Sequence, residues 1–381
     1  MKRWKRWLAA AAAACCLTAA GGEIPCKADG LSAKSAVLYE PESGRILVEK
    51  DAHTPRPMAS TTKIMTALLA LELCDPATEI TVPQQAVLVE GSSLGLRGGD
   101  RITMLDLVTG LMLQSGNDAA NTIAMVTAGS LPAFAEKMNA KAAELGMKDS
   151  HFVTPSGLDQ EGHASSAYDM ALLAAAALRN PLLAEICAKK SAVIAFGNPK
   201  RKVTVTNHNK LLSLYPDAVG MKTGFTKKSG RCLVSAARKD GVTLIAVTLN
   251  SPDDWNDHIR LYEQGFPQLE SFQPSLPELP DVKVAGGLTD TVQLTGQLPP
   301  ALILSSGDGE RLAVKTELPR FVLAPVSAGE TLGRVRYYLD GREVTSVPLT
   351  AAYGVDARPA AGAFGRWLRA LRELTEAFFR L

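Results

Sequence analysis

The sequence lacks the cysteine and histidine patterns that hold metal ions or cross-link small secreted domains. It has six cysteines and five histidines in 381 residues, with neither a C-x-x-C pair nor an H-E-x-x-H pattern among them. Cys15 and Cys16 lie in the apolar N-terminal segment, and the other four cysteines are widely separated. Metal sites and disulfide frameworks use regular spacings of these residues. We therefore expect no metal, no cofactor and no disulfide framework.

The sequence also lacks an excess of charge of either sign. The first 29 residues contain five basic and two acidic residues, which leaves 36 of the 41 basic and 37 of the 39 acidic residues in the rest of the chain. The chain beyond residue 29 is thus almost neutral, which does not favour a nucleic-acid partner. The 46% of hydrophobic residues indicates a globular protein, which excludes collagen-like, coiled-coil and disordered classes, and the length indicates two or three domains.

One apolar stretch opens the chain, but it is too short to cross a membrane. Four basic residues precede the apolar run from Trp7 to Ala20, whereas a spanning helix needs ~20 apolar residues. A basic start, a short apolar core and small residues are typical of a secretory signal peptide. We assign one to residues 1–29, with cleavage between Ala19 and Ala28, and expect an exported protein. A retained membrane anchor is the alternative.

Residues 30–268 have the pattern of a mixed domain. Apolar runs on both sides of the turn 41–44 predict a hairpin, and apolar residues at helical spacing predict helices that start near Ser60, after Thr103 and at Asp118. Four apolar runs between residues 203 and 249 predict an antiparallel sheet. Helices that cover such a sheet make an α+β fold.

Beyond residue 268 the composition changes twice. A cluster of prolines marks residues 269–281 as a Pro-rich linker without regular structure. Short alternating runs with turns at 307–309 and 340–341 predict a small all-β domain over residues 282–355. Residues 362–381 form one apolar stripe flanked by arginines, which is typical of an amphipathic helix on a membrane surface. A helix docked on its own protein is the alternative.

The first of three short motifs is Ser60-Thr61-Thr62-Lys63, at a predicted helix start. Residues three apart on a helix share one face, so the Ser60 hydroxyl and the Lys63 amine lie within reach of each other. A serine needs a base to become a nucleophile, and a lysine is such a base when burial or another cation lowers its pKa. Alone the motif is weak, because a capping serine and a solvated lysine also produce it.

Two further motifs follow in the chain. Ser115-Gly116-Asn117 supplies a second hydroxyl and an amide between two predicted helices, and Lys222-Thr223-Gly224 supplies a second cation and a third hydroxyl on a predicted strand. A glycine at that position lets a substrate backbone approach the strand closely. Each triplet alone fits a turn or a surface strand, but the order of all three motifs is that of serine β-lactamases and penicillin-binding proteins.

The motifs and their surroundings resemble the D-alanyl-D-alanine carboxypeptidases, which are low-molecular-mass penicillin-binding proteins. The resemblance covers nearly the whole chain and is carried by residues 58–66, 113–120, 154–158, 167–171 and 220–226. It implies a β-lactamase/transpeptidase-like domain, then the β domain and the amphipathic tail. It also implies a serine carboxypeptidase that acts on peptidoglycan stem peptides ending in D-Ala-D-Ala at the outer face of the cytoplasmic membrane, and that β-lactams inhibit.

The resemblance implies catalytic roles for three residues. Ser60 would attack the penultimate D-alanine carbonyl, and Lys63 would take its proton. Ser115 would relay the proton to the leaving amine, with help from Lys222.

Five residues are implied in substrate binding. Asn117 would hold the substrate amide, and Lys222 with Thr223 would bind the terminal carboxylate beside Gly224. The backbone N–H groups of Ser60 and Phe225 would stabilise the oxyanion.

Some features differ from the family, and some alternatives stay open. Lys227-Lys228 make the turn after the third motif more basic than in typical relatives, and an arginine that some relatives carry is at best Lys210 here. A class A β-lactamase is disfavoured, because no E-x-x-L-N stretch lies between the second and third motifs. A D,D-endopeptidase on cross-linked peptidoglycan, and a non-catalytic envelope-binding or penicillin-sensing module, stay as alternatives.

Overall fold

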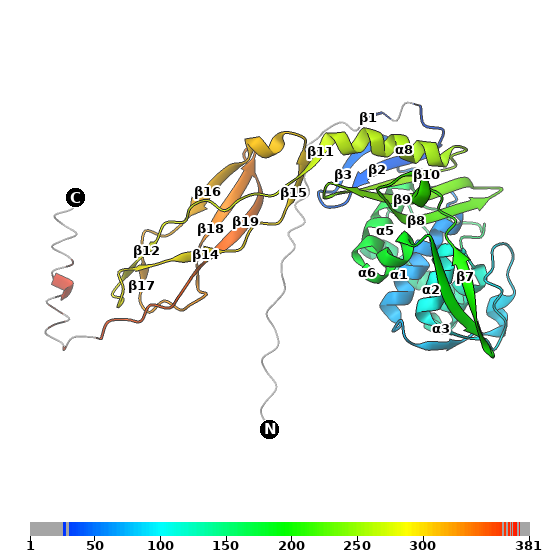
Figure 1. Cartoon of the computed structure of the whole chain (residues 1–381), viewed down its shortest axis with the longest axis horizontal. Helices are drawn as coiled ribbons and strands as arrows, with labels where there is room; N and C mark the ends of the chain where they lie inside the picture. The colour runs from blue at the N-terminus through cyan, green and yellow to red at the C-terminus, as the bar shows by residue number, and fades with distance from the viewer. Residues whose placement is uncertain are drawn as a thin grey trace, which may run out of the picture. The chain divides into compact units, whose positions relative to one another are not determined.

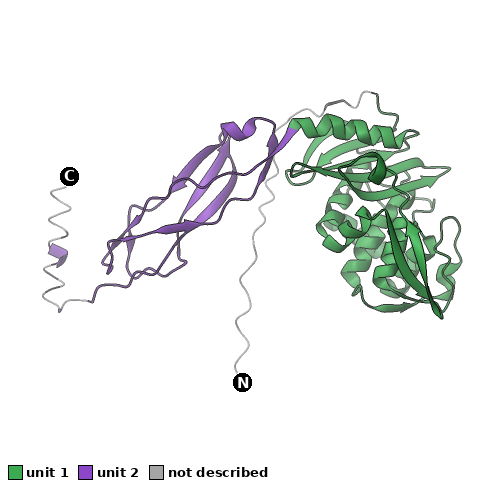
Figure 2. Ribbon diagram, viewed as in Figure 1, with its two compact units in different colours: residues 1–268 green, residues 269–381 purple. Residues whose placement is uncertain are grey.

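The computed structural model describes residues 26–27 and 30–359, together with isolated positions between 362 and 373. The chain divides into two compact units, residues 1–268 and 269–381 (Figure 2). Most of the predicted signal peptide (1–29) and most of the predicted tail helix (362–381) lie outside the described residues. Both assignments therefore stay predictions.

The first unit is built on a six-stranded sheet with the order β1-β3-β2-β10-β9-β8 (Figure 1). Its strands are β1 Cys26–Lys27, β2 Ser35–Glu40, β3 Arg45–Lys50, β8 Ala218–Thr226, β9 Gly230–Lys239 and β10 Val242–Leu249. β1 pairs parallel with β3, and the other pairs are antiparallel. The predicted hairpin is confirmed. Strand β8, which carries the third motif, lies at the edge of the described sheet.

Helices cover both faces of this sheet (Figure 1). Every residue of β10 is buried, and its side chains alternate between two layers. Ile245 and Val247 join the large core that also includes α5, whereas Leu244 lies beside Gly265 of α8 and Thr248 bonds to His258 of α8. The helices are α1 Lys63–Leu73, α2 Met104–Leu113, α3 Asn117–Ala128, α4 Leu131–Glu144, α5 Ala167–Arg179, α6 Pro181–Ala188, α7 Leu211–Leu214 and α8 Asp254–Gly265, with 3-10 turns η1 Ala59–Thr62, η2 Gln84–Val87 and η3 Phe266–Gln268.

A second, four-stranded sheet has the order β4-β5-β6-β7. Its strands are β4 Glu79–Thr81, β5 Arg101–Thr103, β6 Ser191–Gly197 and β7 Lys200–Thr206. The expectation of a single sheet for residues 203–249 is thus wrong for 203–206, because β7 pairs along its whole length with β6 in a hairpin. Among the described residues no single helix has the length and apolar character of a membrane span, although the bent pair α5 and α6 together meets that test by length and composition.

The helix starts near the motifs follow local capping chemistry. Thr103 caps α2, since its Oγ1 accepts a hydrogen bond from the Asp106 N–H at 3.1 Å. The Asp106 carboxylate accepts instead from the N–H of Ala195 on β6, at 3.1 Å, and so ties α2 to the second sheet. Helix α3 begins at Asn117, one residue earlier than expected. Asn117 therefore belongs to the first turn of a helix and not to the preceding loop.

The second unit consists of strands and one short 3-10 turn over the described residues up to 359. Its sheets have the orders β11-β15, β13-β12-β17 and β14-β19-β18-β16. The elements are β11 Leu269–Phe272, β12 Val282–Ala285, β13 Thr291–Val292, β14 Leu294–Gly296, β15 Leu302–Ser305, η4 Asp308–Arg311, β16 Ala313–Glu317, β17 Val322–Leu323, β18 Thr331–Leu339 and β19 Arg342–Ala351. The expected linker 269–281 is too long at its start, because the proline-free residues 269–272 form β11 and pair with β15.

Candidate active site

Ser60 and Lys63 are in direct contact. Lys63 Nζ donates a hydrogen bond to Ser60 Oγ at 2.7 Å. Ser60 lies in the 3-10 turn η1, and Lys63 is the first residue of α1. The turn and the helix place residues three apart on one face, as the motif spacing predicted. A hydroxyl and an amine at this distance are arranged for proton transfer.

Two further acceptors hold the Lys63 side chain, which has no solvent exposure. Its Nζ donates to Asn117 Oδ1 at 2.7 Å and to the Ser156 backbone oxygen at 2.6 Å. The Asn117 Nδ2 in turn donates to the Glu90 backbone oxygen at 2.6 Å. Three acceptors around one amine fix its position beside Ser60. In this arrangement the Asn117 side chain positions Lys63, and its predicted contact with a substrate amide stays a prediction.

The electrostatic environment of Lys63 favours its neutral form. Burial is the main cause that lowers the pKa of Lys63 well below its ordinary value, and the positive charge of Lys222 lowers it further. The Asp118 carboxylate opposes this shift, but its oxygens are engaged by the N–H groups of Leu94 and Leu96. A lysine in such a site is a competent general base.

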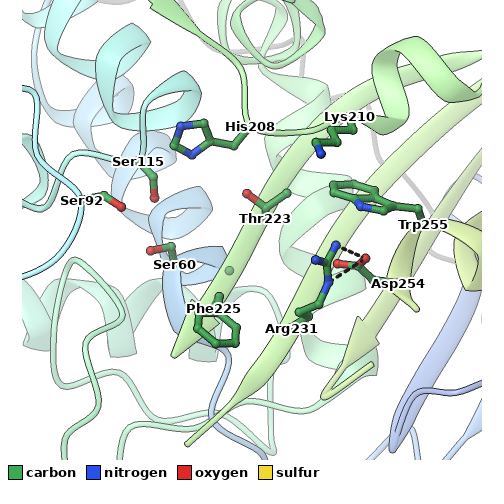
Figure 3. A pocket seen from close by; sticks show the side chains of 11 residues that line it. Ser60, Ser92, Ser115, His208, Lys210, Thr223, Phe225, Arg231, Asp254 and Trp255 are labelled. Atoms are coloured by element: carbon green, nitrogen blue, oxygen red, sulfur yellow. Dashed lines mark hydrogen bonds and ion pairs between the residues drawn. The ribbon is translucent and has the colours of Figure 1, made fainter. Parts of the chain in front are cut away.

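Ser60 lines a pocket of about 520 Å³. Figure 3 shows Ser60, Ser92 and Ser115 on one side of it, Thr223 between, and Arg231 and Trp255 on the other side. Its walls come from η1, the segment between η2 and β5, the loops before α3 and α7, strands β8 and β9, and the start of α8. The complete lining is Ser60, Ser92, Ser115, His208, Lys210, Thr223, Gly224, Phe225, Arg231, Asp254 and Trp255.

The predicted site residues fall into two groups. Ser60, Ser115, Thr223, Gly224 and Phe225 line the pocket. The other three, which are Lys63, Asn117 and Lys222, are buried behind it, with exposed fractions of 0%, 4% and 1%. The structure thus brings residues from three distant stretches of sequence around one pocket.

Two residues beside the pocket have a left-handed backbone. Ala59 has φ of 48° and Ser115 has φ of 63°. Residues with a side chain rarely adopt this conformation, which costs on the order of 1–3 kcal/mol. Ala59 directly precedes Ser60 in the chain, and Ser115 places its own hydroxyl at the pocket. Strain at these positions is consistent with a site held in a reactive geometry.

Glycines allow two backbone segments to approach the Ser60 turn. A Cβ on Gly224 of β8 would lie 3.0 Å from the Ser60 nitrogen and 2.9 Å from the Met58 oxygen. A Cβ on Gly157 would lie 1.9 Å from the Ala59 oxygen, and Gly157 has φ of 83°. Strand β8 therefore passes close to the Ser60 N–H group, which leaves the peptide nitrogens of Ser60 and Phe225 near each other.

Lys222 is buried beneath the strand that carries Thr223. Its Nζ donates to the Thr223 backbone oxygen at 3.1 Å. Burial lowers the pKa of Lys222 to about 7, and the neighbouring Cys187 thiol opposes the shift. Lys222 therefore lies behind the pocket wall and is not part of the pocket lining.

Comparison with known proteins identifies the family. The sequence profile of the D-alanyl-D-alanine carboxypeptidases (Peptidase_S11) matches residues 23–253, which is more than half of the chain. The chain belongs to the D-alanyl-D-alanine carboxypeptidase family. A second profile, the C-terminal domain of penicillin-binding protein 5, matches residues 278–357. The α+β fold with a following all-β domain is thereby confirmed.

Individual members of this carboxypeptidase family match along most of the chain. The D-alanyl-D-alanine carboxypeptidase DacF of Bacillus subtilis (strain 168) is 32% identical, with 84% of this chain and 85% of DacF covered. DacC of Escherichia coli (strain K12) is 31% identical, with 92% and 90% covered. The crystal structure of penicillin-binding protein 5 from Haemophilus influenzae superimposes with a TM-score of 0.65 at 28% identity and covers 86% of this chain and 98% of that protein.

The pocket of this carboxypeptidase family member also contains residues that the motifs did not indicate. Arg231 of β9 donates through Nε to Asp254 Oδ1 at 3.0 Å, and its guanidinium lies 5.4 Å from the ring centre of Trp255. His208 and Lys210 come from the loop before α7. Among these groups only Lys210 had a weak signal in the sequence, as a possible counterpart of an arginine that some relatives carry. Arg231, Asp254 and Trp255 had none, since no motif spacing connects β9 to the start of α8.

Proposed function

We propose that this member of the family removes the terminal D-alanine from peptidoglycan stem pentapeptides through an acyl-enzyme on Ser60. The observation that carries the proposal is the contact of 2.7 Å between Lys63 Nζ and Ser60 Oγ at the wall of the pocket. Family membership supplies the reaction class, and the residues supply the chemistry. Peptidoglycan is the substrate and β-lactams are inhibitors, as the relation to penicillin-binding proteins indicates.

Acylation begins when Ser60 Oγ attacks the penultimate D-alanine carbonyl. Neutral Lys63 takes the hydroxyl proton, and the carbonyl oxygen becomes an oxyanion. The Ser60 and Phe225 N–H groups stabilise that oxyanion, a contribution of roughly 3 kcal/mol per donor. The intermediate collapses with cleavage of the carbon–nitrogen bond. Ser115 passes a proton from the Lys63 ammonium to the leaving amine, and D-alanine departs.

Water then completes the reaction. It attacks the Ser60 ester, a proton moves through Lys63, and the shortened peptide is released with Ser60 restored. Penicillins present a strained amide in place of the D-Ala-D-Ala bond and acylate the same serine.

Substrate seating follows from the edge position of β8. An extended stem peptide adds to this edge by backbone hydrogen bonds, where Gly224 leaves room for close approach. The terminal carboxylate lies beside the Thr223 hydroxyl, with Lys222 beneath the strand. Arg231 is the guanidinium that lines the pocket on the same side, and guanidinium groups bind carboxylates in a bidentate manner. We include Arg231 in the carboxylate site for this reason, with Asp254 and Trp255 as the groups that orient it.

The place of action is the outer face of the cytoplasmic membrane. The sequence supports this assignment through the signal-peptide pattern of residues 1–29 and the amphipathic pattern of residues 362–381. The relatives' substrate, peptidoglycan, lies outside the cytoplasm. We propose export, signal removal and attachment to the membrane surface through the tail.

Labelling with a fluorescent penicillin tests the acyl-enzyme. The unchanged protein should carry covalent label, and Ser60→Ala should carry none while unfolding at the same temperature. Label on Ser60→Ala would contradict the assignment of the nucleophile, and a lack of label on the unchanged protein would favour the non-catalytic module.

The reaction itself is tested with two defined substrates. Release of free D-alanine from a muramyl pentapeptide is expected. Cleavage of a cross-linked muropeptide dimer without release of D-alanine from the pentapeptide would favour the D,D-endopeptidase instead.

A further inference from the structure

Three large apolar side chains of the second unit are exposed on or beside one small sheet, β13-β12-β17. Leu323, Leu288 and Phe321 have exposed fractions of 71%, 59% and 57%. Solvated side chains of this size are ordinary when scattered, whereas a contiguous group indicates a contact surface. We call these three residues the apolar tip.

Strand register explains why these side chains point outward together. β12 and β17 run parallel, with Val284 opposite Val322 and Ala285 opposite Leu323. Val284 packs in the domain core with Val322 against it, so the alternate residues face outward. Phe321 and Leu323 are two apart and share this outer face. The inner face is needed for the core, and the outer face has no such structural role among the described residues.

Leu288 follows the end of β12 and is held there by its backbone. Its N–H donates to the Asp356 backbone oxygen at 2.8 Å, and Gly287 forms a bridge with Ala357. The Arg358 N–H donates to the Gly286 oxygen at 2.9 Å. The last continuous described residues, up to 359, are therefore fastened to the end of β12 beside the apolar tip.

The tail thus starts at this surface. Four residues lie between Pro359 and Phe364, the first apolar residue of the stripe in 362–381, and the five Cα steps between them reach at most ~18 Å when the chain is extended. Two described residues of the stripe, Trp367 and Leu371, are themselves 60% and 47% exposed.

We propose that the apolar tip inserts into the lipid interface next to the tail, as a second membrane contact of the protein. The inference rests on the proposed membrane attachment and adds the tip to it. The chain continues into the predicted tail from the end of the domain where the apolar tip lies. A bilayer is a surface broad enough to receive both the tip and the apolar stripe of the tail. The charged rim includes Arg358 paired with Asp290 at 2.7 Å, together with exposed Lys283 and Arg320 and the acidic Asp356. Because both signs are present, the contact depends on apolar insertion more than on anionic headgroups.

Cosedimentation of the full mature chain with phosphatidylcholine vesicles tests the proposal. The variant carrying Phe321→Ser and Leu323→Ser should partition into vesicles roughly tenfold less than the unchanged protein, because two apolar side chains no longer enter the interface. The matched control carries Leu298→Ser and Val314→Ser, two residues that are 67% and 47% exposed outside the β13-β12-β17 sheet. It should bind like the unchanged protein.

The outcomes separate this inference from the function on which it rests. Equal vesicle binding by all three proteins would overturn the proposed insertion of the apolar tip and leave the tail as the membrane contact. A lack of vesicle binding by the unchanged protein would overturn both tip and tail, while D-alanine release in solution would still stand. If the tip variant lost self-association in sedimentation equilibrium but kept its vesicle binding, the tip would be an interface with a second copy. D-alanine release should be equal in all three proteins, which verifies that each is folded.

Discussion

Asn117 Oδ1 accepts a hydrogen bond from Lys63 Nζ at 2.7 Å, and the two residues are 54 positions apart in the chain. The same nitrogen, Lys63 Nζ, donates to Ser60 Oγ. The second motif thus reaches the first through its amide, and it reaches the pocket through the hydroxyl of Ser115. Each motif contributes one group to the pocket and one group behind it.

Replacing Asn117 tests its role as a positioning residue for Lys63. Asn117→Asp puts a negative charge beside the amine and should raise the Lys63 pKa. Because the neutral amine is the base, the acid limb of the kcat/KM profile should move up by about 1 pH unit or more. Asn117→Ala should lower kcat/KM by roughly 100-fold without that displacement. A profile that is unchanged in Asn117→Asp would show that the amide does not control Lys63.

Lys222 should reduce stability while it supports activity. Its pKa in the folded protein is about 7 against an ordinary 10.5, so the unfolded chain holds the proton over that interval. The cost to the folded state is therefore full below pH 7 and fades as the pH rises toward 10.5. Lys222→Met should raise the free energy of unfolding by about 2 kcal/mol below pH 7, with a smaller gain at high pH, and should lose most activity. Urea unfolding across pH measures this, and a gain that grows with pH would contradict it.

Two substitutions at Ser115, whose backbone is left-handed, distinguish backbone strain from the chemical role of the hydroxyl. Ser115→Ala removes the hydroxyl and keeps the strain, whereas Ser115→Gly removes both. Both variants should lose roughly 100-fold in kcat, because the leaving amine lacks its proton relay. Ser115→Gly should be more stable than Ser115→Ala by about 1 kcal/mol. Thermal unfolding and D-alanine release distinguish the two effects, and equal stabilities would argue against backbone strain.

Gly157 should be intolerant of a side chain for steric reasons. Gly162 is the matched control, since it has φ of 78° but its nearest atom would be 3.7 Å from an added Cβ, compared with 1.9 Å at Gly157. Gly162→Ala should cost only the backbone strain, about 1 kcal/mol. Gly157→Ala should cost roughly 3 kcal/mol and should slow penicillin acylation, because the added methyl group displaces the turn that carries Ser60. Similar effects of the two substitutions would refute the close approach.

Arg231 should recognise the terminal carboxylate. Arg231→Gln is expected to raise KM for D-alanine-terminated peptides by roughly 10-fold, while a peptide with an amidated terminus loses little. Arg238→Gln, on the same strand and outside the pocket, is the control. Equal losses on the free and amidated peptides would assign Arg231 to the structure of the pocket wall.

Much of the architecture was accessible from local patterns. The hairpin of β2 and β3, the capped start of α2 and the strands β8 to β10 follow from periodicity and turn residues, and the structure confirms them. The assignment of β7 to the main sheet was wrong. Strand pairing depends on contacts between distant segments, and the sequence of a single strand does not specify its partner strand. The linker prediction failed at residues 269–272 for the same reason.

The sequence alone was sufficient for the contact between Ser60 and Lys63, for the family, and for the approximate positions of the helices and strands that carry the three motifs. These depend on neighbours within a few positions, where chain geometry leaves little choice. Packing between distant segments was needed to bring Asn117 to Lys63, to offer the Ser156 backbone oxygen as an acceptor 93 residues away, and to bury Lys222. It also placed the Arg231–Asp254 pair across the pocket from Ser60 (Figure 3). Burial and desolvation arise from the packing of distant segments, and they lower the pKa values of Lys63 and Lys222.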